Sequence, residues 1–382
     1  MNLELSDEQA AVRDLAADFT DREIVPFAAA WDRAESVDRS VIAKLGAVGF
    51  LGLTIPEEYG GSGGDHLAYC LVLEELGRGD SAVRGIVSVS LGLVAKSVNA
   101  YGTEEQKRRW LPGLTSGEAL GCFALTEPGT GSDAANLTTK AVRDGDGWLI
   151  TGSKMFITNG TWADVALVFA RTGEPGHRGI TAFLVETALP GFERRTVHGK
   201  LGLRGQATAE LVFDGVRVPD SARLGAEGKG FTVAMAALAK GRMSVAAGCV
   251  GIARACLEAA VKYAGEREQF GTPIASRQLV QELLSDIAVD VDAARLLTWR
   301  VADHIERGLP FATESSVAKL YASEAAVRAA NNALQVFGGY GFIDEYPVGK
   351  YLRDARVMTL YEGTSQIHKL LIGRSLTGIN AF

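Results

Sequence analysis

Three long helical repeats of apolar residues in the C-terminal part of the chain constrain the fold more than any other feature. Apolar side chains recur at helical spacing over Phe231–Arg267, Arg277–Arg307 and Glu314–Val336. Each segment is long enough to span a four-helix bundle. We therefore predict a C-terminal α-helical bundle domain over residues 229–382.

The middle of the chain has a different pattern, which predicts strands. Four runs are β-branched or alternating: Trp148–Thr151, Asp164–Ala170, Ile180–Val185 and Glu210–Val218. Gly, Asn, Pro and Asp separate these runs, and the crossover helices of a parallel sheet are missing between them. The pattern predicts a middle domain over residues 119–228, built as an antiparallel β-barrel or sandwich.

Residues 1–118 are predicted to form an N-terminal α-helical domain. Ser6-Asp7-Glu8-Gln9 is a helix N-cap signature, followed by apolar residues at helical spacing. Small residues dominate 81–100, which indicates close helix packing or a ligand wall. The order of helices, strands and helices makes the predicted fold class α+β and multidomain, as a length of 382 residues suggests.

Composition argues against several classes of protein. A formal charge of −7 is unlike that of a nucleic-acid binder. The four cysteines form no CxxC pair and the five histidines are scattered, so we expect neither a metal site nor a disulfide framework. The acidic N-terminus is no secretory signal, and no uninterrupted apolar run is long enough to span a membrane. We expect a soluble cytoplasmic protein without nucleic-acid or membrane partners.

The segment Tyr361–Gln366 places Glu362 directly before a Gly-Thr-Ser-Gln turn and after the apolar run Val357–Leu360. Apolar neighbours remove solvent from a carboxylate and raise its pKa above about 4.3. Such a carboxylate suits proton abstraction next to a carbonyl near neutral pH. Alternatively, the segment is a helix N-terminus, capped by Ser or Thr, with Glu362 merely near the helix dipole. These residues alone leave both interpretations open.

Two glycine-rich segments are candidate ligand loops. Phe123–Asp133 offers backbone N–H groups and hydroxyls that could hold a pyrophosphate or a flavin edge, although the same residues are common in ordinary loops. Its spacing is not the GxGxxG of dinucleotide-binding folds. Gln335–Phe342 contains three glycines, of which a helix C-cap explains one. Close backbone approach to a ligand is the better explanation for the others.

Two further segments have both an ordinary and a functional interpretation. Phe156 and Thr158 precede an Asn-Gly pair, which indicates a hairpin turn, or else a stacking face and a hydrogen-bond donor for a heteroaromatic ring. Arg267 ends a long helical repeat, where it is either a partner of the helix dipole or a clamp for a pyrophosphate.

The order and spacing of these segments resemble the flavin-dependent acyl-CoA dehydrogenases over essentially the whole chain. Ala124–Asp133 looks like the first signature of that family, and Gln335–Asp354 looks like the second. The resemblance implies FAD as cofactor, a homotetramer in which a neighbouring subunit completes each site, and an electron-transfer flavoprotein as the acceptor of electrons.

The resemblance also implies site residues by position. The FAD-binding residues would be Phe123, Leu125, Thr126, Gly131, Ser132, Phe156, Thr158, Arg267, Gln269, Phe270, Gln278, Gln335, Gly338, Gly339, Thr364 and Gln366. Ser132, Arg242, Arg84 and Gly363 would contact the substrate.

Glu362 stands where the short- and medium-chain branches of the family have their catalytic base. It would remove the α-proton of an acyl thioester while the β-hydride passes to the flavin, giving a trans-2-enoyl thioester. The Glu362 backbone N–H and a flavin ribityl hydroxyl would polarise the thioester carbonyl. Another branch has its glutamate at the position of Gly241, which cannot act as a base, so Glu362 remains the one candidate.

The substrate is less well determined. Ala239 replaces an aspartate that often contributes to substrate binding, and Ala239–Gly251 resembles members that oxidise carrier-protein thioesters in antibiotic biosynthesis. Ser81–Gly85 instead resembles the glutaryl-CoA dehydrogenase branch, in which an arginine at the Arg84 position meets a distal carboxylate. Arg84 either does the same, or points to solvent or pairs with a local carboxylate such as Asp80. A non-redox role, as a flavin-binding partner or a cyclase- or isomerase-like enzyme, is the remaining alternative.

Overall fold

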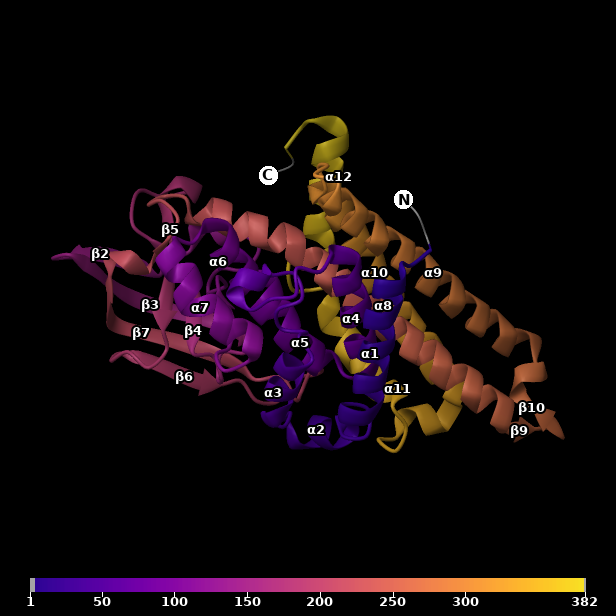
Figure 1. Ribbon diagram of the computed structural model, residues 1–382. Helices are drawn as coiled ribbons and strands as arrows, with labels where there is room; N and C mark the ends of the chain where they lie inside the picture. Colours follow the sequence, from indigo (N-terminus) through magenta and orange to yellow (C-terminus); the bar gives the residue numbers. More distant parts are fainter. Residues whose placement is uncertain (1–3, 381–382) are drawn as a thin grey trace.

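The computed structural model describes residues 4–380 (Figure 1). Its N-terminal part is helical, with α1 (Asp7–Glu23), α2 (Ala28–Ala34), α3 (Ser40–Ala47), α4 (His66–Gly79), α5 (Ser81–Val89), the π-helix η2 (Ser90–Ala95), α6 (Lys96–Tyr101) and α7 (Glu104–Ser116). The predicted N-cap is confirmed, because the Ser6 side chain accepts from the Gln9 backbone N–H at 3.2 Å and the Gln9 side chain accepts from Ser6 N–H.

The segment over residues 81–100 is helical but not one regular α-helix. The π-helix η2 separates α5 from α6, and every residue from Ser81 to Val98 is buried. A π-helical turn inserts an extra residue into the helix and changes which side chains face a given neighbour. Gly92 allows this turn to approach α4, since a Cβ there would lie 2.6 Å from the Tyr69 hydroxyl.

The middle part forms one mixed sheet of eight strands, at the left of Figure 1. Its strands are β1 (Gly121–Ala124), β2 (Lys140–Asp144), β3 (Gly147–Thr158), β4 (Val165–Arg171), β5 (Ile180–Glu186), β6 (Phe192–Thr196), β7 (Thr208–Pro219) and β8 (Arg223–Leu224). The main path runs β6-β7-β3-β2-β4-β5-β8, and β1 pairs with β4.

The four predicted strands are confirmed as β3, β4, β5 and β7, whereas β1, β2, β6 and β8 were not predicted because they are short. The sheet also differs from a purely antiparallel one. β1 pairs with β4 in parallel, and so does β2 through Lys140 and Arg171. β1 enters the sheet from the helical part and is followed by the β2–β3 hairpin, so no tight turn fixes its direction relative to β4.

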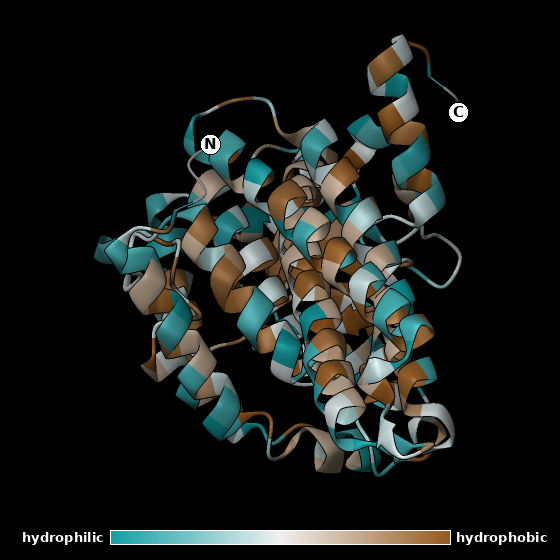
Figure 2. Cartoon of the chain, turned by 90° about the vertical axis from the view of Figure 1, so that its right-hand side faces the viewer, coloured by the Kyte–Doolittle hydropathy of each residue, from teal (hydrophilic) through white to brown (hydrophobic). Residues whose placement is uncertain are grey.

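The C-terminal part is a helical bundle, as predicted. It contains α8 (Gly230–Glu266), β9 (Glu268–Gln269), β10 (Thr272–Pro273), α9 (Gln278–Glu306), α10 (Ala312–Phe337), the short helix η7 (Gly338–Phe342), α11 (Val348–Met358) and α12 (Ser365–Thr377). The β9–β10 hairpin lies at the end of the molecule opposite the sheet (Figure 1). Figure 2 shows apolar and polar segments alternating along the bundle helices, and α12 projecting beyond them.

Two helical stretches among residues 4–380 are long and apolar enough to cross a membrane by length and composition alone. They are Ser81–Tyr101 and Gly230–Glu266. The first is buried from Ser81 to Val98 and the second is largely buried, which is the situation of core helices in a folded domain.

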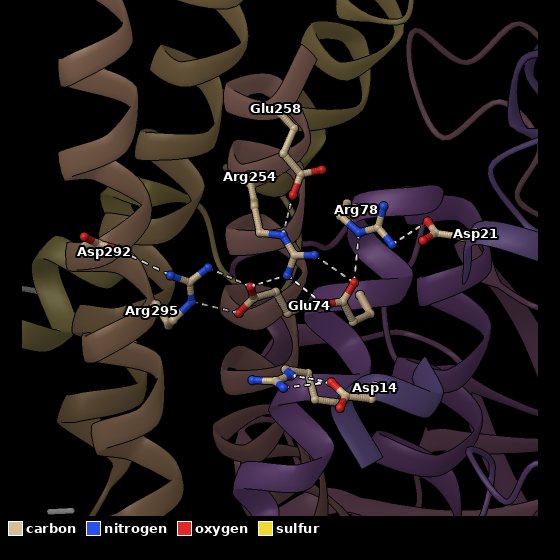
Figure 3. Close-up of polar contacts among 10 residues, drawn as sticks. Asp14, Asp21, Glu74, Arg78, Arg254, Glu258, Asp292 and Arg295 are labelled. Atoms are coloured by element: carbon tan, nitrogen blue, oxygen red, sulfur yellow. Dashed lines mark hydrogen bonds and ion pairs between the residues drawn. The ribbon is translucent and has the colours of Figure 1, made fainter. Parts of the chain in front are cut away.

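A network of ion pairs joins α4, α8 and α9 (Figure 3). Arg254 on α8 donates to Glu74 at 3.1 Å and to Glu75 at 2.6 Å, both on α4. Arg295 on α9 donates to Glu74 at 2.8 Å, and Arg78 donates to Glu75 at 2.8 Å. Both glutamates are buried, so each depends on its arginine partners for compensation of the lost hydration.

Candidate active site

Glu362 lies in a bend between α11 and α12, and two consecutive residues of this bend have positive φ. The φ angles are 51° at Glu362 and 99° at Gly363. Thr364 caps α12, since its hydroxyl accepts from Ile367 N–H at 3.2 Å. The two interpretations of this segment are therefore compatible: Thr364 is a helix cap, and the carboxylate precedes the helix in a sharply turned backbone.

The carboxyl group of Glu362 is held in a buried, closely packed position. Its Oε2 is buried and has no hydrogen-bond partner within residues 4–380. A Cβ on Gly241 would lie 2.4 Å from Oε2 and 2.8 Å from a methyl group of Leu93, so only glycine leaves room for the carboxylate. Burial raises the pKa of Glu362 to about 7, against the opposing effect of the Arg84, Lys319 and Arg242 charges. The predicted rise of this pKa is confirmed.

Arg84 projects from α5 into the same region, and its side chain is only 1% exposed. It donates to the Ser88 hydroxyl at 2.9 Å and to the Tyr361 hydroxyl at 2.6 Å. Its Nε has no partner among the described residues. The alternatives in which Arg84 points to solvent or pairs with Asp80 are wrong, because Asp80 is paired with Lys350 at 3.3 Å. Glu362 is the carboxylate whose charge acts on Arg84.

Arg242 follows Gly241 on α8 and also faces Glu362. Its Nη1 donates to Ser316 at 3.4 Å, while its buried Nε has no partner among residues 4–380. Burial lowers the pKa of Arg242, and the negative charge of Glu362 opposes that change. The structure thus brings together four of the predicted catalytic and substrate residues: Glu362, Gly363, Arg84 and Arg242.

One set of the predicted cofactor residues lies on the sheet side of this region. Phe123, on β1, packs against the cluster of Val89, Leu93 and Ala237. The β1–β2 loop contains Thr126, Gly131 and Ser132, and the end of β3 contains Phe156 and Thr158. Phe156 has a φ of 60° and is 64% exposed. Leu125 instead places its side chain in the hydrophobic core.

A second set lies at the opposite end of the molecule, around the β9–β10 hairpin (Figure 1). A hollow of about 550 Å³ is lined there by Arg267, Gln269, Gly338 and Gly339, together with Tyr263, Ile274, Val336, Phe337, Tyr340 and Ile343. Phe270 at the hairpin tip is 94% exposed, Gln278 begins α9, and Gln335 lies in the last turn of α10. Thr364 and Gln366 lie at the start of α12, directly after the bend that contains Glu362. One chain therefore does not bring all the predicted cofactor residues together.

Sequence reasoning missed three buried residues that support the site. Lys154 donates to Leu125 O at 3.1 Å and to Glu127 at 2.9 Å, and thereby fixes the β1–β2 loop. Gln206 accepts from the Thr158 hydroxyl at 3.2 Å. Lys319 on α10 donates to Gly363 O at 2.7 Å. For Lys154 and Lys319 the available signal was a lysine within an apolar strand or helix face. Without knowledge of the packing, a buried lysine at such a position cannot be distinguished from an exposed one.

Comparison with known proteins gives a consistent assignment. Sequence models of the acyl-CoA dehydrogenase N-terminal, middle and C-terminal domains match residues 6–118, 122–216 and 228–377. An acyl-CoA dehydrogenase of Bacillus subtilis is 45% identical over 377 residues, which cover 98% of this chain and 100% of the relative.

Two solved structures are similar throughout. The butyryl-CoA dehydrogenase of Megasphaera elsdenii superposes with a TM-score of 0.96 at 40% identity, covering 98% of this chain and 100% of that one. A glutaryl-CoA dehydrogenase of Mycobacterium smegmatis in complex with FADH2 superposes with a TM-score of 0.95 at 37% identity, covering 99% and 96%. With three matching domains and a relative of nearly equal length, this chain belongs to the acyl-CoA dehydrogenase family and is an oxidoreductase.

Proposed function

We propose that this protein oxidises an acyl thioester to its trans-2-enoyl thioester and that Glu362 removes the α-proton. The observation that carries the proposal is the Glu362 carboxyl group itself, whose buried Oε2 has no hydrogen-bond partner among the described residues. Burial raises the pKa of this carboxyl to about 7, which makes it an effective acceptor of a carbon-bound proton near neutral pH.

The backbone of the same bend supports the polarisation of the thioester carbonyl. The Glu362 backbone N–H donates to no acceptor among residues 4–380. An N–H group left free beside a general base can donate a hydrogen bond to an enolate oxygen and so stabilise the negative charge that develops there. The proposed base and the N–H donor belong to the same residue. The backbone conformation of Glu362, with its positive φ, therefore sets the direction of the N–H relative to the side chain.

The residues present fit an FAD, and a bound FAD would accept the β-hydride. Cβ atoms on Gly129, Gly131, Gly338 and Gly339 would meet no heavy atom within 4 Å, so these glycines leave open surface for a cofactor. Phe156 offers an exposed ring, and Arg267 borders the hollow as a cation for a pyrophosphate. Because the hollow around Arg267 lies apart from the sheet-side loops beside Glu362, we propose that a second subunit completes each site in a homotetramer.

Arg84 favours a short acyl group that carries a polar or anionic distal end. Three cations, Arg84, Arg242 and Lys319, act on the single carboxylate of Glu362. A buried arginine with an unpartnered Nε is costly unless a substrate group meets it. A dicarboxylic acyl thioester would bring that anion.

The base assignment is tested with Glu362→Gln, which keeps the shape of the side chain but removes the base. We expect the FAD-loaded variant to lose the bleaching of flavin absorbance by butyryl-CoA and glutaryl-CoA by about 10²–10⁴-fold. Glu58→Gln, at an exposed site, is the control and should bleach normally. Normal bleaching by the Glu362 variant would remove Glu362 from the role of base.

The distal-group assignment is tested with Arg84→Met under anaerobic conditions. We expect kcat/KM for glutaryl-CoA to fall by at least about tenfold more than for butyryl-CoA, since a charge-assisted hydrogen bond is lost only with the former. Equal losses on both thioesters would mean that Arg84 supports the fold of the site rather than the selection of substrate.

The tether of the substrate and the electron acceptor belong to the same proposal. We propose a CoA thioester and an electron-transfer flavoprotein, acting in the cytoplasm, with a carrier-protein thioester as the alternative. Matched butyryl-CoA and butyryl-carrier-protein thioesters, compared by the rate of flavin bleaching, distinguish the two. Bleaching by the CoA thioester alone would exclude the carrier-protein alternative.

A further inference from the structure

The bend that contains Glu362 rests on two buried side chains from other positions of the bundle. Lys319 on α10 is 0% exposed, and its ammonium donates to Gly363 O at 2.7 Å. His368 on α12 is also 0% exposed, and its ring faces the backbone of Glu362 and Gly363. Both residues therefore lie directly against the peptide that follows the base.

The backbone conformation of the bend requires such support. A non-glycine residue with positive φ is unfavourable by about 1–3 kcal/mol unless its surroundings enforce it. Glu362 is such a residue, and Gly363 follows it with a φ of 99°. A Cβ on Gly363 would lie 3.0 Å from His368 Nε2, so the imidazole closes one side of the bend while Lys319 binds its carbonyl.

The hydrogen bond from Lys319 is the specific part of this arrangement. An ammonium in a fully buried position loses its hydration, and burial lowers the pKa of Lys319 to about 8. Among the charged groups that act on Lys319, Glu362 and Glu324 favour its charged form and Arg242 disfavours it. A lysine is retained at such a position when its charge or its donor has a use that an apolar residue cannot supply.

We propose that Lys319 is a positioning residue for the reaction: its ammonium holds the Gly363 carbonyl, fixes the direction of the Glu362 carboxylate, and sets the charge that this carboxylate faces. The inference rests on the proposed function of Glu362 as the base.

Lys319 differs in one respect from the other charged and titratable groups around Glu362. Arg84 faces it from α5, Arg242 from α8, Tyr69 from α4, and His368 from α12. Burial, together with the charges of Lys319 and Arg242, lowers the pKa of His368 to about 3, so the imidazole is neutral at physiological pH. Lys319 is the one cation among the described residues that donates to a backbone carbonyl of the bend, whereas Arg84 donates to the Tyr361 side chain.

The test is an infrared titration of the Glu362 carboxyl in the FAD-loaded protein, which needs no substrate. The C=O stretch of the protonated carboxyl is assigned by its loss in Glu362→Gln and followed from about pH 5 to about pH 9. Removal of a nearby cation disfavours the carboxylate, so Lys319→Met should raise the midpoint by about one unit. Lys319→Gln should raise it similarly, and Lys319→Arg should keep it near that of the unaltered protein.

A merely structural lysine gives a different result. If Lys319 only stabilises the fold, Lys319→Met should have a lower melting temperature but an unchanged midpoint in the infrared titration. That outcome overturns the proposal. A midpoint raised equally in the Met and Arg variants also overturns it, because charge would not be the cause. If the Met variant fails to fold, the shorter Gln variant, which keeps a neutral donor, gives the same reading.

Failure of the proposed function is seen separately. Bleaching by butyryl-CoA and glutaryl-CoA in the unaltered protein tests the reaction, whereas the titration tests the action of Lys319 on Glu362. Where the protein bleaches, the pH at half-maximal rate should rise in Lys319→Met together with the infrared midpoint. A shift of one without the other contradicts the assignment of Lys319 to the reaction.

Discussion

Glu362 combines three properties that are individually unfavourable for a folded protein. It is a carboxylate with a buried, unpartnered oxygen, it has a positive φ, and it is packed against a helix that tolerates only glycine opposite it. Local conflicts of this kind concentrate at functional sites because packing elsewhere maintains them. The raised pKa of Glu362 is a direct consequence of the same packing.

The raised pKa of Glu362 has a consequence for stability that Glu362→Gln can reveal. The folded protein keeps the proton on Glu362 up to a pKa of about 7, whereas the unfolded chain releases it near the ordinary value of 4.5. The folded state thus binds more protons between these values, and stability falls as the pH rises through that window. We expect the melting temperature of Glu362→Gln, relative to the unaltered protein, to be higher at about pH 8 than at about pH 5. Equal differences at both pH values would contradict the raised pKa.

Gly241 and Gly265 lie on the same helix, α8, and provide a matched pair at the scale of one element. A Cβ on Gly241 would meet Glu362 Oε2 at 2.4 Å, whereas a Cβ on Gly265 would meet no atom within 4 Å. Gly241→Ala should displace the carboxylate and reduce the rate of flavin bleaching by about tenfold or more. Gly265→Ala should leave that rate unchanged and stabilise the helix by up to about 1 kcal/mol. Rate measurements and thermal unfolding of both variants check this.

The ion pairs among α4, α8 and α9 make a second prediction at the scale of elements. Arg254→Met leaves two buried glutamates, Glu74 and Glu75, with fewer cations between them. We expect the free energy of unfolding to fall by about 3–5 kcal/mol, seen as a clear fall in the melting temperature. Arg195→Met is the control, because Arg195 and its partner Glu193 are both exposed and such pairs contribute about 0–1 kcal/mol. Similar melting temperatures for the two variants would show that burial of the pairs is unimportant.

Elements with a strong period could be predicted from the sequence, and those defined by their neighbours could not. The three long helices α8, α9 and α10 begin and end within two residues of their predicted bounds, because their apolar repeats are long. The π-helix η2 has no such signal: its extra residue follows from the contact of Gly92 with Tyr69 on another helix. The strand β1 likewise takes its parallel direction from β4, forty residues further along the chain.

The residues of the candidate site also divide into those indicated by the adjacent sequence and those that only the fold brings to the site. The local apolar neighbours of Glu362 and the turn that follows made it a candidate but left a helix cap open, and the resemblance of the ordered motifs to a known family selected it as the base. Lys319, by contrast, lies more than one element away from Gly363, to which it donates. Nothing in the sequence around Lys319 distinguishes it from a solvated lysine on a helix, since only the fold brings it to the bend.

At the scale of the whole molecule, the two sets of predicted cofactor residues lie in different places. Phe123 of the sheet-side set packs beside Leu93, which borders the Glu362 region, whereas the hollow around Arg267, Gln269 and Gly338 lies by the β9–β10 hairpin, at the end of the molecule opposite the sheet (Figure 1). Exposed apolar side chains accompany the second set, with Phe270 at 94% and Leu279 at 75% exposure. Such side chains near a cofactor hollow are typical of a surface that another subunit covers.

Arg267→Met tests whether this hollow binds the cofactor. Arg267 is exposed beside the hollow, with its guanidinium 5.5 Å from the ring centroid of Tyr340. Loss of a charge-assisted hydrogen bond to a pyrophosphate should weaken FAD retention by about 10–100-fold, measured by the ratio of flavin to protein absorbance after dialysis. Arg108→Met, at a 68% exposed side chain far from the hollow, should retain FAD normally. Unchanged retention in Arg267→Met would exclude the hollow as the pyrophosphate site.

The separation of the two sets of cofactor residues has a genetic consequence. A chain with Glu362→Gln lacks the base but has an intact hollow, and a chain with Arg267→Met has the base but a damaged hollow. If each site takes its proposed base from one chain and its hollow from another, two alleles that are each impaired alone should complement each other when co-expressed. Mixed oligomers would then contain sites in which both parts are unaltered, and a cell carrying both alleles would recover an activity that neither gene encodes by itself.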